Sequence, residues 1–593
     1  MTTIYGIIGP SDAGEMAAMA GRLTHHGAPG PVWSPAPDVR FGRVGPGAAP
    51  ALDGDRVLFA GHIVGGGGTA GQPDGITPEA LLIQALSLNG PDALAGIDGG
   101  FAVALVDPSG RWLHLARDPY GLEPLSFARL GRGGIAFAGE YKALLALDDV
   151  IARPDPDAIT HFLHTGYCRP DECFLADIRP IPPGHGITFG LDRPAPADRR
   201  RFALPGPCTS TRPPEAHAAG LEAALTDAVR RRLPPAGSPP TGPIGVSLSG
   251  GVDSAFMLAA IRACRPDADI HSFTVGHGED DPEIEGARLA AAHMETHHHE
   301  VILSPRDLAA ILPDAIAQVE DPIGNEEYPC LFAMGRVAAE HVDTLFIGNG
   351  SDTLFAGMPS HRVAHAAFAR PRLRRGLEEL MTAERSGIPP ASRAGRLLLH
   401  ARHGDHPPAA PPPVNGARHV VPPVSFTPEA PEPLTRMLHR SIADYDGRMG
   451  AQHMLFAGPG LSVRMPYWDR DVIRAAMEMP DGVKIHDGQG KHVLRSAAAR
   501  RLLPPAIAWR RKGIQQLRHD RDFADMLDGL ACDLLHPQAL DHRGLFTRDQ
   551  IDRLQAARRD VYASADAYRL WSVIVVEIWA RLFVDARGAR PAR

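Results

Sequence analysis

The stretch Pro243-Ile244-Gly245-Val246-Ser247-Leu248-Ser249-Gly250-Gly251-Val252-Asp253-Ser254 decides the fold of the second half of this chain. Val246 and Leu248 alternate with small residues, as in a buried strand, and residues 255–261 continue with apolar side chains at helical spacing. Glycines between a strand and a helix leave backbone N–H groups and the positive end of the helix dipole exposed, and they let phosphate oxygens approach closely. The stretch therefore predicts a strand, an anion-binding loop and a helix.

Asp253 stands in the first turn of that helix, where a bound phosphate would repel its carboxylate unless a cation lay between them. We therefore expect Asp253 to be a Mg²⁺ ligand. The loop is not a Walker sequence, because no Gly-Lys-Ser/Thr follows the glycines. Residues 249–254, Ser-Gly-Gly-Val-Asp-Ser, instead resemble the pyrophosphate-binding loop of the ATP pyrophosphatases, which split ATP into AMP and pyrophosphate. The resemblance implies that the nucleotide is bound by Leu248, Ser249, Gly250, Gly251, Asp253 and Ser254.

The composition is that of a soluble protein with several domains. A chain of 593 residues predicts two to four domains, and 44% hydrophobic with 22% charged residues is typical of globular proteins. A net charge of −8 argues against nucleic acid as a partner. The six cysteines form no Cys-x-x-Cys pair, so neither a disulfide framework nor a cysteine zinc site is expected. Because no signal peptide or membrane-spanning run is evident, we expect a cytoplasmic protein without a membrane partner.

Strands and helices alternate after the glycine loop. Residues 270–276 and 299–303 are typical of strands and residues 283–293 of a helix, which predicts a doubly wound parallel sheet. Residues 297–299 are three consecutive histidines. Because a strand turns consecutive side chains to opposite faces, the three cannot all reach one ion, and we expect surface residues.

The first 205 residues contain short β-rich runs separated by glycine and aspartate, which predict stacked sheets. Residues 99–107, 117–125 and 137–144 resemble the N-terminal glutaminase domain of the asparagine synthetase B family. The resemblance implies an α/β protein with an Ntn-type stacked-sheet domain followed by a doubly wound ATP-pyrophosphatase domain. The expected boundaries are 1–205 for the degenerate glutamine amidotransferase-like domain, 206–242 for a connection, and 243–593 for the second domain, with a family-divergent insertion at 359–450.

The departures from that family concern the glutaminase site. The family uses a cysteine exposed by removal of the initiator methionine, whereas Thr2 follows Met1 here. The family strand Asn-Gly-Glu-Ile-Tyr-Asn, which grips the substrate glutamine, reads Ala-Gly-His-Ile-Val-Gly at residues 60–65. We expect a retained scaffold without glutaminase activity, and the alternative is an active enzyme with Thr2 as nucleophile.

Further motifs of the second domain also match the family. Residues 348–352, Gly-Asn-Gly-Ser-Asp, resemble a Gly-Glu-Gly-Ser-Asp loop, which implies that Gly348 lies at the nucleotide and that Asp352 is the second Mg²⁺ ligand. The strand containing Val275 resembles the one that contacts adenine. The motif positions imply that Lys491 touches the leaving pyrophosphate and that Lys512 stabilises the adenylate. Two loop carboxylates, Glu326 and Glu327, are candidates for orienting or deprotonating an amine.

The resemblance implies an ATP-dependent, AMP-forming amide ligase that uses ATP and Mg²⁺. Without a glutaminase, the amine comes either from free ammonia or from the substrate itself. The second case matches two offshoots of the family, β-lactam synthetase and the lasso-peptide macrolactam synthetases (lasso cyclases). β-Lactam synthetase has a tyrosine at the position of Asn349, and an amide cannot act as a base.

We therefore favour a lasso cyclase that joins an Asp or Glu side chain of a precursor peptide to the peptide's N-terminal amine. The open alternatives are β-lactam synthetase, ammonia-dependent asparagine synthetase and a non-catalytic ATP- or peptide-binding scaffold. The expected partners are a peptide or a small amino-acid-derived substrate. A lasso pathway would add a leader peptidase and a precursor-recognition protein.

Overall fold

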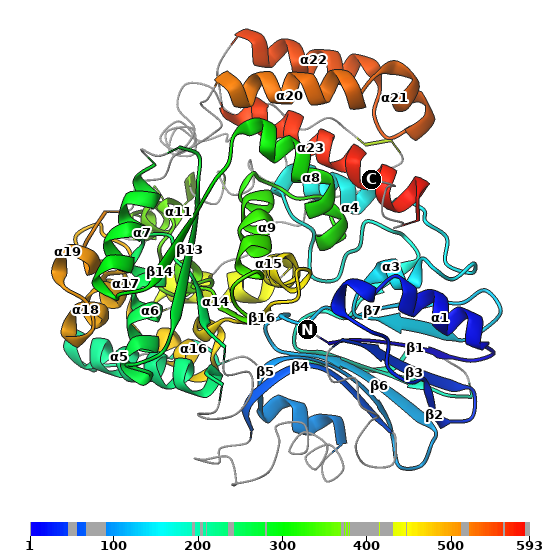
Figure 1. Cartoon of the computed structure of the whole chain (residues 1–593), viewed down its shortest axis with the longest axis horizontal. Helices are drawn as coiled ribbons and strands as arrows, with labels where there is room; N and C mark the ends of the chain where they lie inside the picture. Colours follow the sequence, from blue (N-terminus) through cyan, green and yellow to red (C-terminus); the bar gives the residue numbers. More distant parts are fainter. Residues whose placement is uncertain are drawn as a thin grey trace.

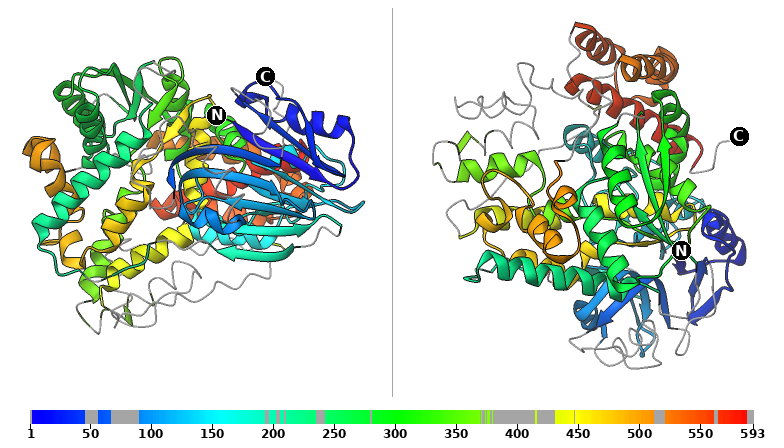
Figure 2. Two further views of the ribbon diagram at one scale, coloured as in Figure 1. Left: turned by 90° about the horizontal axis from the view of Figure 1, so that it is seen from below. Right: turned by 60° about the vertical axis from the view of Figure 1, so that its left-hand side comes forward.

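The computed structural model places two stacked sheets in residues 3–201, called the first half below, and a third sheet with its helices in residues 214–585, called the second half (Figures 1 and 2). It describes residues 2–45, 56–66, 90–192, 196–201, 205–208, 210–234, 242–278, 281–368, 414–415, 431–445, 447–511, 521–560 and 564–587, with a few positions between 370 and 379.

The two N-terminal sheets are antiparallel, in the strand orders β2-β3-β1-β8-β7-β9 and β11-β10-β6-β5-β4. Their facing sides share one apolar core, in which Phe41, Phe127, Phe137 and Phe189 interlock. The stacked-sheet prediction is confirmed. The strands are β1 Thr3–Ile8, β2 Trp33–Ala36, β3 Val39–Val44, β4 Val57–Gly66, β5 Ile97–Val106, β6 Trp112–Arg117, β7 Ser126–Arg129, β8 Ile135–Ala138, β9 Ile178–Pro180, β10 His185–Gly190 and β11 Pro196–Arg201. The helices of this half are α1 Ala13–Gly21, α3 Tyr141–Leu144 and α4 Pro156–Thr165.

The third sheet is parallel throughout, in the order β14-β13-β12-β15-β16. The chain runs outward from β12 through β13 to β14 and then returns to the other side for β15, so the topological switch point lies between β12 and β15. Ligands of open α/β sheets bind in the crevice beyond the carboxyl ends of the strands at such a point. The strands are β12 Ile244–Ser247, β13 Ile270–Gly276, β14 His297–Ile302, β15 Thr344–Phe346 and β16 Ser462–Arg464.

Helices pack around this sheet and extend from it. The predicted helix at 283–293 is α7 Pro282–His293, and the strand predicted at 299–303 begins earlier, so all three consecutive histidines belong to β14. Around the sheet lie α5 Pro214–Arg232, α6 Val252–Cys264, α8 Pro305–Val319, α9 Glu327–Ala338, α10 Ser351–Leu354, α15 Gly447–Ala457, α16 Arg470–Met477, α17 Asp481–Lys484, α18 His492–Arg501 and α19 Pro505–Ala508. Near the C-terminal end lie α20 Arg521–Leu534, α21 Pro537–Arg543, α22 Arg548–Asp560 and α23 Ser564–Ala580.

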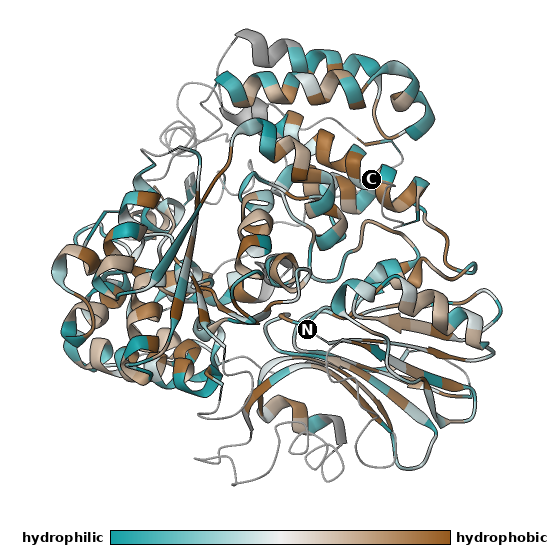
Figure 3. Cartoon of the chain, in the orientation of Figure 1, coloured by the Kyte–Doolittle hydropathy of each residue, from teal (hydrophilic) through white to brown (hydrophobic). Residues whose placement is uncertain are grey.

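The hydropathy of α23 explains its position. Trp571, Ile574 and Trp579 are buried where α23 contacts α4 and α8, and Figure 3 shows hydrophobic colour along this helix and hydrophilic colour on α22. None of the helices in the described ranges has both the length and the apolarity needed to cross a membrane.

Most of the insertion expected at 359–450 lies outside the described residues. Its two ends form α11 Pro359–Phe368 and α14 Pro433–Tyr445, which pack together through Ala364, Phe368, Leu434 and Leu438.

A buried carboxylate joins the two halves. Glu320 follows α8 and accepts the backbone N–H groups of Tyr141 and Lys142 of α3, both at 2.7 Å. The indole N–H of Trp579 contacts the hydroxyl of Tyr141 at 3.0 Å and the carbonyl of Glu320 at 2.9 Å. These hydrogen bonds fix α3 of the first half against α8 and α23 of the second.

A cavity of about 110 Å³ lies beside this contact, lined by both halves of the chain. Tyr141 and Cys168 line it from the first half, and Asp321 and Met454 line it from the second. Burial raises the pKa of Asp321 to about 7, although a hydrogen bond from Tyr141 opposes the change. Asp321 therefore holds its proton in the folded chain at pH values where an unfolded aspartate has lost it.

This difference predicts a pH-dependent stability. Between the ordinary aspartate pKa of about 3.9 and the folded value of about 7, the folded state binds the extra proton, so Asp321 lowers stability as the pH rises through that window. Asp321→Asn keeps the neutral, hydrogen-bonding shape and removes the titration. Urea unfolding from pH 4.5 to 8 should show the variant losing less free energy of unfolding than the wild type, by roughly 1–3 kcal/mol. Identical pH profiles would contradict a raised pKa at Asp321.

Candidate functional site

The glycine loop after β12 is closed by Ser254. The N–H of Leu248 donates to the carbonyl of Phe273 at 2.8 Å, and the N–H of Ser249 donates to the hydroxyl of Ser254 at 3.1 Å. The same hydroxyl lies 3.3 Å from the carbonyl of Gly251. Gly251 is the N-cap of α6 and provides no side-chain cap, so the first N–H groups of that helix remain available to an anion. Ser249 and Ser254 thus shape the loop and leave the helix end for the ligand.

Gly250 allows the loop to pack against a neighbouring helix. Its φ of +65° is in the left-handed region, and a Cβ there would lie 2.6 Å from the carbonyl carbon of Gly286 in α7. A Cβ on Gly286 would in turn lie 2.3 Å from Nη1 of Arg510. The guanidinium donates through Nη2 to the carbonyl of Pro282 at 3.0 Å and to Glu285 at 3.1 Å. A positive charge therefore lies close to the predicted anion loop.

Two carboxylates meet one ammonium group at the switch point. Nζ of Lys491 lies 2.5 Å from Oδ2 of Asp253 in α6 and 2.8 Å from Oδ1 of Asp352 in α10, and 3.4 Å from the hydroxyl of Ser351. The side chain of Lys491 is 9% exposed, that of Asp253 14% and that of Asp352 49%. Lys491 is the N-cap of α18 with a φ of +56°, and its N–H donates to the carbonyl of Phe355 at 3.0 Å. The structure thus joins three motifs that lie far apart in the sequence.

The donor set fits a hard divalent cation. Oδ1 of Asp253 is buried and has no hydrogen-bond partner among the described residues, so one carboxylate oxygen remains for a ligand. Asp352 is half exposed and can turn an oxygen toward the same point. A Cβ on Gly357 would lie 1.8 Å from Oδ1 of Asp352, so any side chain at position 357 would displace that carboxylate. Two carboxylates with exposure to solvent are typical ligands of Mg²⁺ shared with phosphate oxygens.

The remaining predicted residues lie at different distances from this centre. A Cβ on Gly348 would lie 3.3 Å from the N–H nitrogen of Ser254, so Gly348 lies over the start of α6. Val275 is partly buried near the carboxyl end of β13. Glu326 is half-buried at the N-cap of α9, and Glu327 is exposed in the first turn of that helix. Lys512 lies outside the described residues.

Three supporting residues were not assigned from the sequence. Ser351 contacts Lys491, the hydroxyl of Tyr467 donates to the carbonyl of Asp253 at 2.9 Å, and Arg510 lies beside Gly286. Ser351 and Arg510 belong to the motifs that contain Asp352 and Lys512, so the sequence pattern that could have indicated them lies next to residues that were predicted. Tyr467 acts through its hydroxyl on a backbone carbonyl, which no spacing rule predicts.

Comparison with known proteins agrees with this geometry. A family model described as asparagine synthase matches residues 220–581, which include the glycine loop, both carboxylates and Lys491. The chain belongs to the asparagine synthase family. A glutamine amidotransferase domain model matches residues 77–196. Members of the asparagine synthase family are ATP-dependent amide ligases, as this chain therefore is.

Two relatives show how far the likeness extends. The chain is 27% identical to a putative glutamine-hydrolysing asparagine synthetase of Mycobacterium tuberculosis over 84% of this chain and 78% of the relative. It is 23% identical to a glutamine-hydrolysing asparagine synthetase of Bacillus subtilis over 69% of this chain and 66% of the relative.

The ion pairs of Lys491 predict an unusual response to Mg²⁺. In Lys491→Met, Asp253 and Asp352 lose their shared cation, so the two negative charges should attract a divalent cation more strongly than in the wild type. The rise in thermal midpoint on adding MgCl₂ without nucleotide should therefore be larger in the variant. Arg288→Met, which breaks the exposed pair with Glu300 at 2.6 Å, is the matched control and should respond as the wild type does. Equal Mg²⁺ responses in all three proteins would show that the carboxylates do not share a cation position.

Proposed function

We propose that this chain is a lasso-type macrolactam synthetase, which adenylates an Asp or Glu side chain of a peptide and closes a ring with an amine of the same peptide. The proposal is supported by the cluster of Lys491, Asp253 and Asp352 at the glycine loop, in a chain that has Thr2 where the family nucleophile is cysteine. Ammonia from glutamine is then unavailable. An amine carried by the substrate replaces it.

None of the six cysteines replaces the missing nucleophile. They are Cys168, Cys173, Cys208, Cys264, Cys330 and Cys532, all remote in sequence from the amino terminus. Cys168 and Cys173 line the cavity between the halves, and burial raises the pKa of both thiols well above the ordinary value. They remain protonated and unreactive at neutral pH.

The glutaminase-like half also places a histidine where the family has glutamate. His62 is half-buried, and burial together with the charge of Arg464 holds its pKa well below the ordinary value. Glu123 nearby is 3.7 Å from His453 of α15, and burial followed by the neighbouring Asp118 raises its pKa to about 8. The environment of these residues favours neutral side chains, which suit a structural core better than a pocket for a charged amino acid.

In the adenylation step, a carboxylate oxygen of the peptide bonds to the α-phosphorus of ATP and the bond to pyrophosphate breaks. The N–H groups at the start of α6, the ammonium of Lys491 and the guanidinium of Arg510 provide positive charge for the departing pyrophosphate. Asp253 and Asp352 would hold Mg²⁺, which supplies further positive charge to the phosphates when bound. Lys512 is proposed to stabilise the acyl-adenylate.

In the second step, the amine attacks the activated carbonyl carbon, AMP leaves, and the amine loses a proton. Holding amine and carboxylate in one substrate makes this attack intramolecular, which lowers the barrier by up to roughly 7–11 kcal/mol when the two are well oriented. Asn349 cannot accept the proton. Glu326, half-buried at the N-cap of α9, and Glu327 beside it are the proposed acceptors or orienting groups.

Ammonia-dependent asparagine synthesis is the second candidate. Both relatives described above carry the name asparagine synthetase, and the ATP-cleaving centre would serve that reaction equally well. β-Lactam synthesis is disfavoured by Asn349, and a purely binding scaffold would not need Lys491 between two carboxylates. A leader peptidase and a precursor-recognition protein are the additional partners that the lasso proposal requires.

Product analysis distinguishes these reactions. We would incubate the full chain with ATP, Mg²⁺ and a panel of linear peptides, each with a free N-terminal amine and one internal Asp or Glu at successive positions. The expected result is AMP formation together with the loss of one water from one peptide of the panel, detected by mass spectrometry. The N-acetylated form of that peptide is the matched control and should yield no ring.

Parallel reactions contain aspartate with ammonium or with glutamine. Asparagine formed from ammonium, with no dehydrated peptide, would establish the second candidate. Asparagine formed from glutamine would show an active glutaminase and overturn the proposal, and binding of ATP without AMP in any reaction would identify a scaffold.

A further inference from the structure

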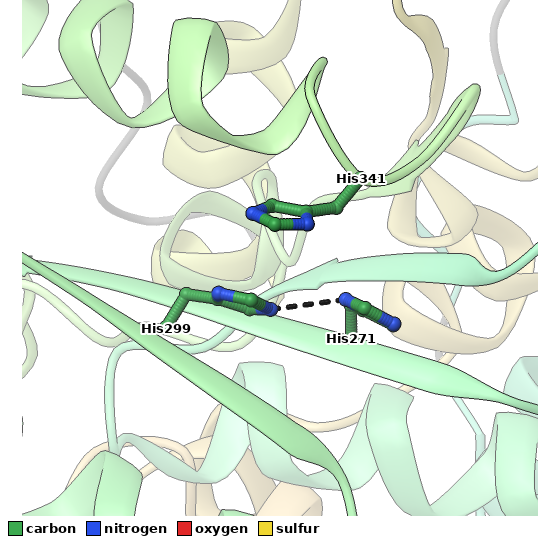
Figure 4. Close-up of side chains that lie close together, drawn as sticks. All are labelled: His271, His299 and His341. Atoms are coloured by element: carbon green, nitrogen blue, oxygen red, sulfur yellow. Dashed lines mark hydrogen bonds between the residues drawn. The ribbon is translucent and has the colours of Figure 1, made fainter.

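Three histidines lie together at the amino-terminal ends of the strands of the parallel sheet, on the opposite side of the sheet from the glycine loop at the carboxyl ends. His271 is near the start of β13, His299 is in β14, and His341 lies in the turn between α9 and β15 (Figure 4). We propose that His271, His299 and His341 form a binding site for a late first-row transition-metal ion such as Zn²⁺. This inference is independent of the proposed function and of the Mg²⁺ position.

The spacing of the ring nitrogens fits such an ion. Nδ1 of His271 and Nε2 of His299 are 2.9 Å apart, and one nitrogen from each of the three histidines lies within 4.8 Å of the others. Two imidazole ligands of tetrahedral Zn²⁺, with Zn–N bonds of 2.0–2.1 Å, have nitrogens roughly 3.3–3.4 Å apart. If the two nitrogens moved apart by a few tenths of an ångström, both could therefore coordinate one ion instead of contacting each other.

His341 can complete the set because it is exposed. Its ring stacks on that of His299, with centroids 4.2 Å apart and an angle of 29° between the planes (Figure 4). A rotation of this exposed side chain changes which nitrogen faces the other two rings. Three nitrogen ligands and one solvent position complete a tetrahedral coordination.

A carboxylate lies next to the outer nitrogen of one of these histidines, as in many metal sites. Nε2 of His271, the nitrogen that does not face His299, lies 3.6 Å from Oδ1 of Asp269. Nε2 of His297 lies 3.5 Å from the same oxygen. A carboxylate that accepts the second N–H of a ligand histidine fixes its tautomer and raises its basicity toward the metal.

The protonation states also suit metal binding. Burial lowers the pKa of His271 despite the opposing charge of Asp269. Burial and then the nearby His341 and His271 lower the pKa of His299. Neutral imidazole is the form that coordinates Zn²⁺, Co²⁺, Ni²⁺ or Cu²⁺.

The site is built across strands, which explains why three consecutive histidines did not predict it. Strand alternation places His298 on the other side of the sheet, where its Nδ1 lies 2.8 Å from the hydroxyl of Ser272. His299 faces a histidine of β13 and one from a distant turn instead. An ion here would link β13, β14 and the start of β15 at the edge opposite to the glycine loop.

Zinc titration of the full chain without an affinity tag tests the inference. After chelator treatment and dialysis, calorimetry with ZnCl₂ in 10 mM MgCl₂ should show one equivalent in the wild type that weakens at least tenfold in His299→Ala and in His341→Ala. Co²⁺ should give visible bands typical of tetrahedral nitrogen coordination only where that equivalent is present. Zn²⁺ should raise the thermal midpoint of the wild type and not of the two variants.

His298→Gln is the matched control, because it removes a neighbouring histidine and keeps a hydrogen-bonding side chain toward Ser272. It should bind Zn²⁺ as the wild type does. Because His341 is exposed, His341→Ala should fold as the wild type does, so weaker Zn²⁺ binding in this variant reports the loss of a ligand. Equal Zn²⁺ affinity and stoichiometry in the wild type and in His341→Ala, or equal loss in His298→Gln, would overturn the proposal.

Discussion

The contact between Lys491 and the carboxylates of Asp253 and Asp352 is the interaction on which the rest of the site depends. It joins the first turns of two helices that follow neighbouring strands of the sheet to the start of a third helix more than a hundred residues away in sequence. Without a cation between them, two carboxylates at the positive ends of two helices would repel each other as well as any phosphate. The ammonium permits both to face one point, and that point is where the sheet's strand order reverses.

The surrounding residues hold these three side chains in position. Glycine is required at Gly250 and Gly357 because any side chain would collide with α7 or with Asp352 itself. Tyr467 fixes the backbone of Asp253, and Arg510 adds a second cation on the other side of the loop. In the N-terminal half, desolvation lowers the pKa of His62 and raises that of Glu123, and contacts with Glu320 and Trp579 attach this half to the synthetase half.

The sequence predicted the parts of this site that depend on local pattern. The bounds of β13 match the expected strand at 270–276, and the Ser-Gly-Gly-Val-Asp-Ser stretch forms the strand–loop–helix unit that its glycines indicate. Contacts between segments that lie far apart in the sequence were harder to predict. The resemblance implied a pyrophosphate contact for Lys491 but not its ion pairs with Asp253 and Asp352. Nothing in the sequence indicated the role of Tyr467, and the histidine cluster forms only because two strands and a turn lie side by side. Asn349 and Thr2 differ from the residues of the family at these positions, and neither difference identifies the source of the amine.

The most direct measurement is Mg²⁺-dependent exchange of labelled pyrophosphate into ATP by Asp253→Asn and Asp352→Asn, with whichever carboxylate substrate supports exchange in the wild type. If these two carboxylates and Lys491 hold the magnesium pyrophosphate, both variants should lose at least 100-fold in exchange, which corresponds to roughly 2.7 kcal/mol in the transition state. Asp343→Asn, an exposed carboxylate just before β15 at the opposite edge of the sheet, should exchange as the wild type does. Undiminished exchange in Asp253→Asn and Asp352→Asn would contradict the assignment of this site.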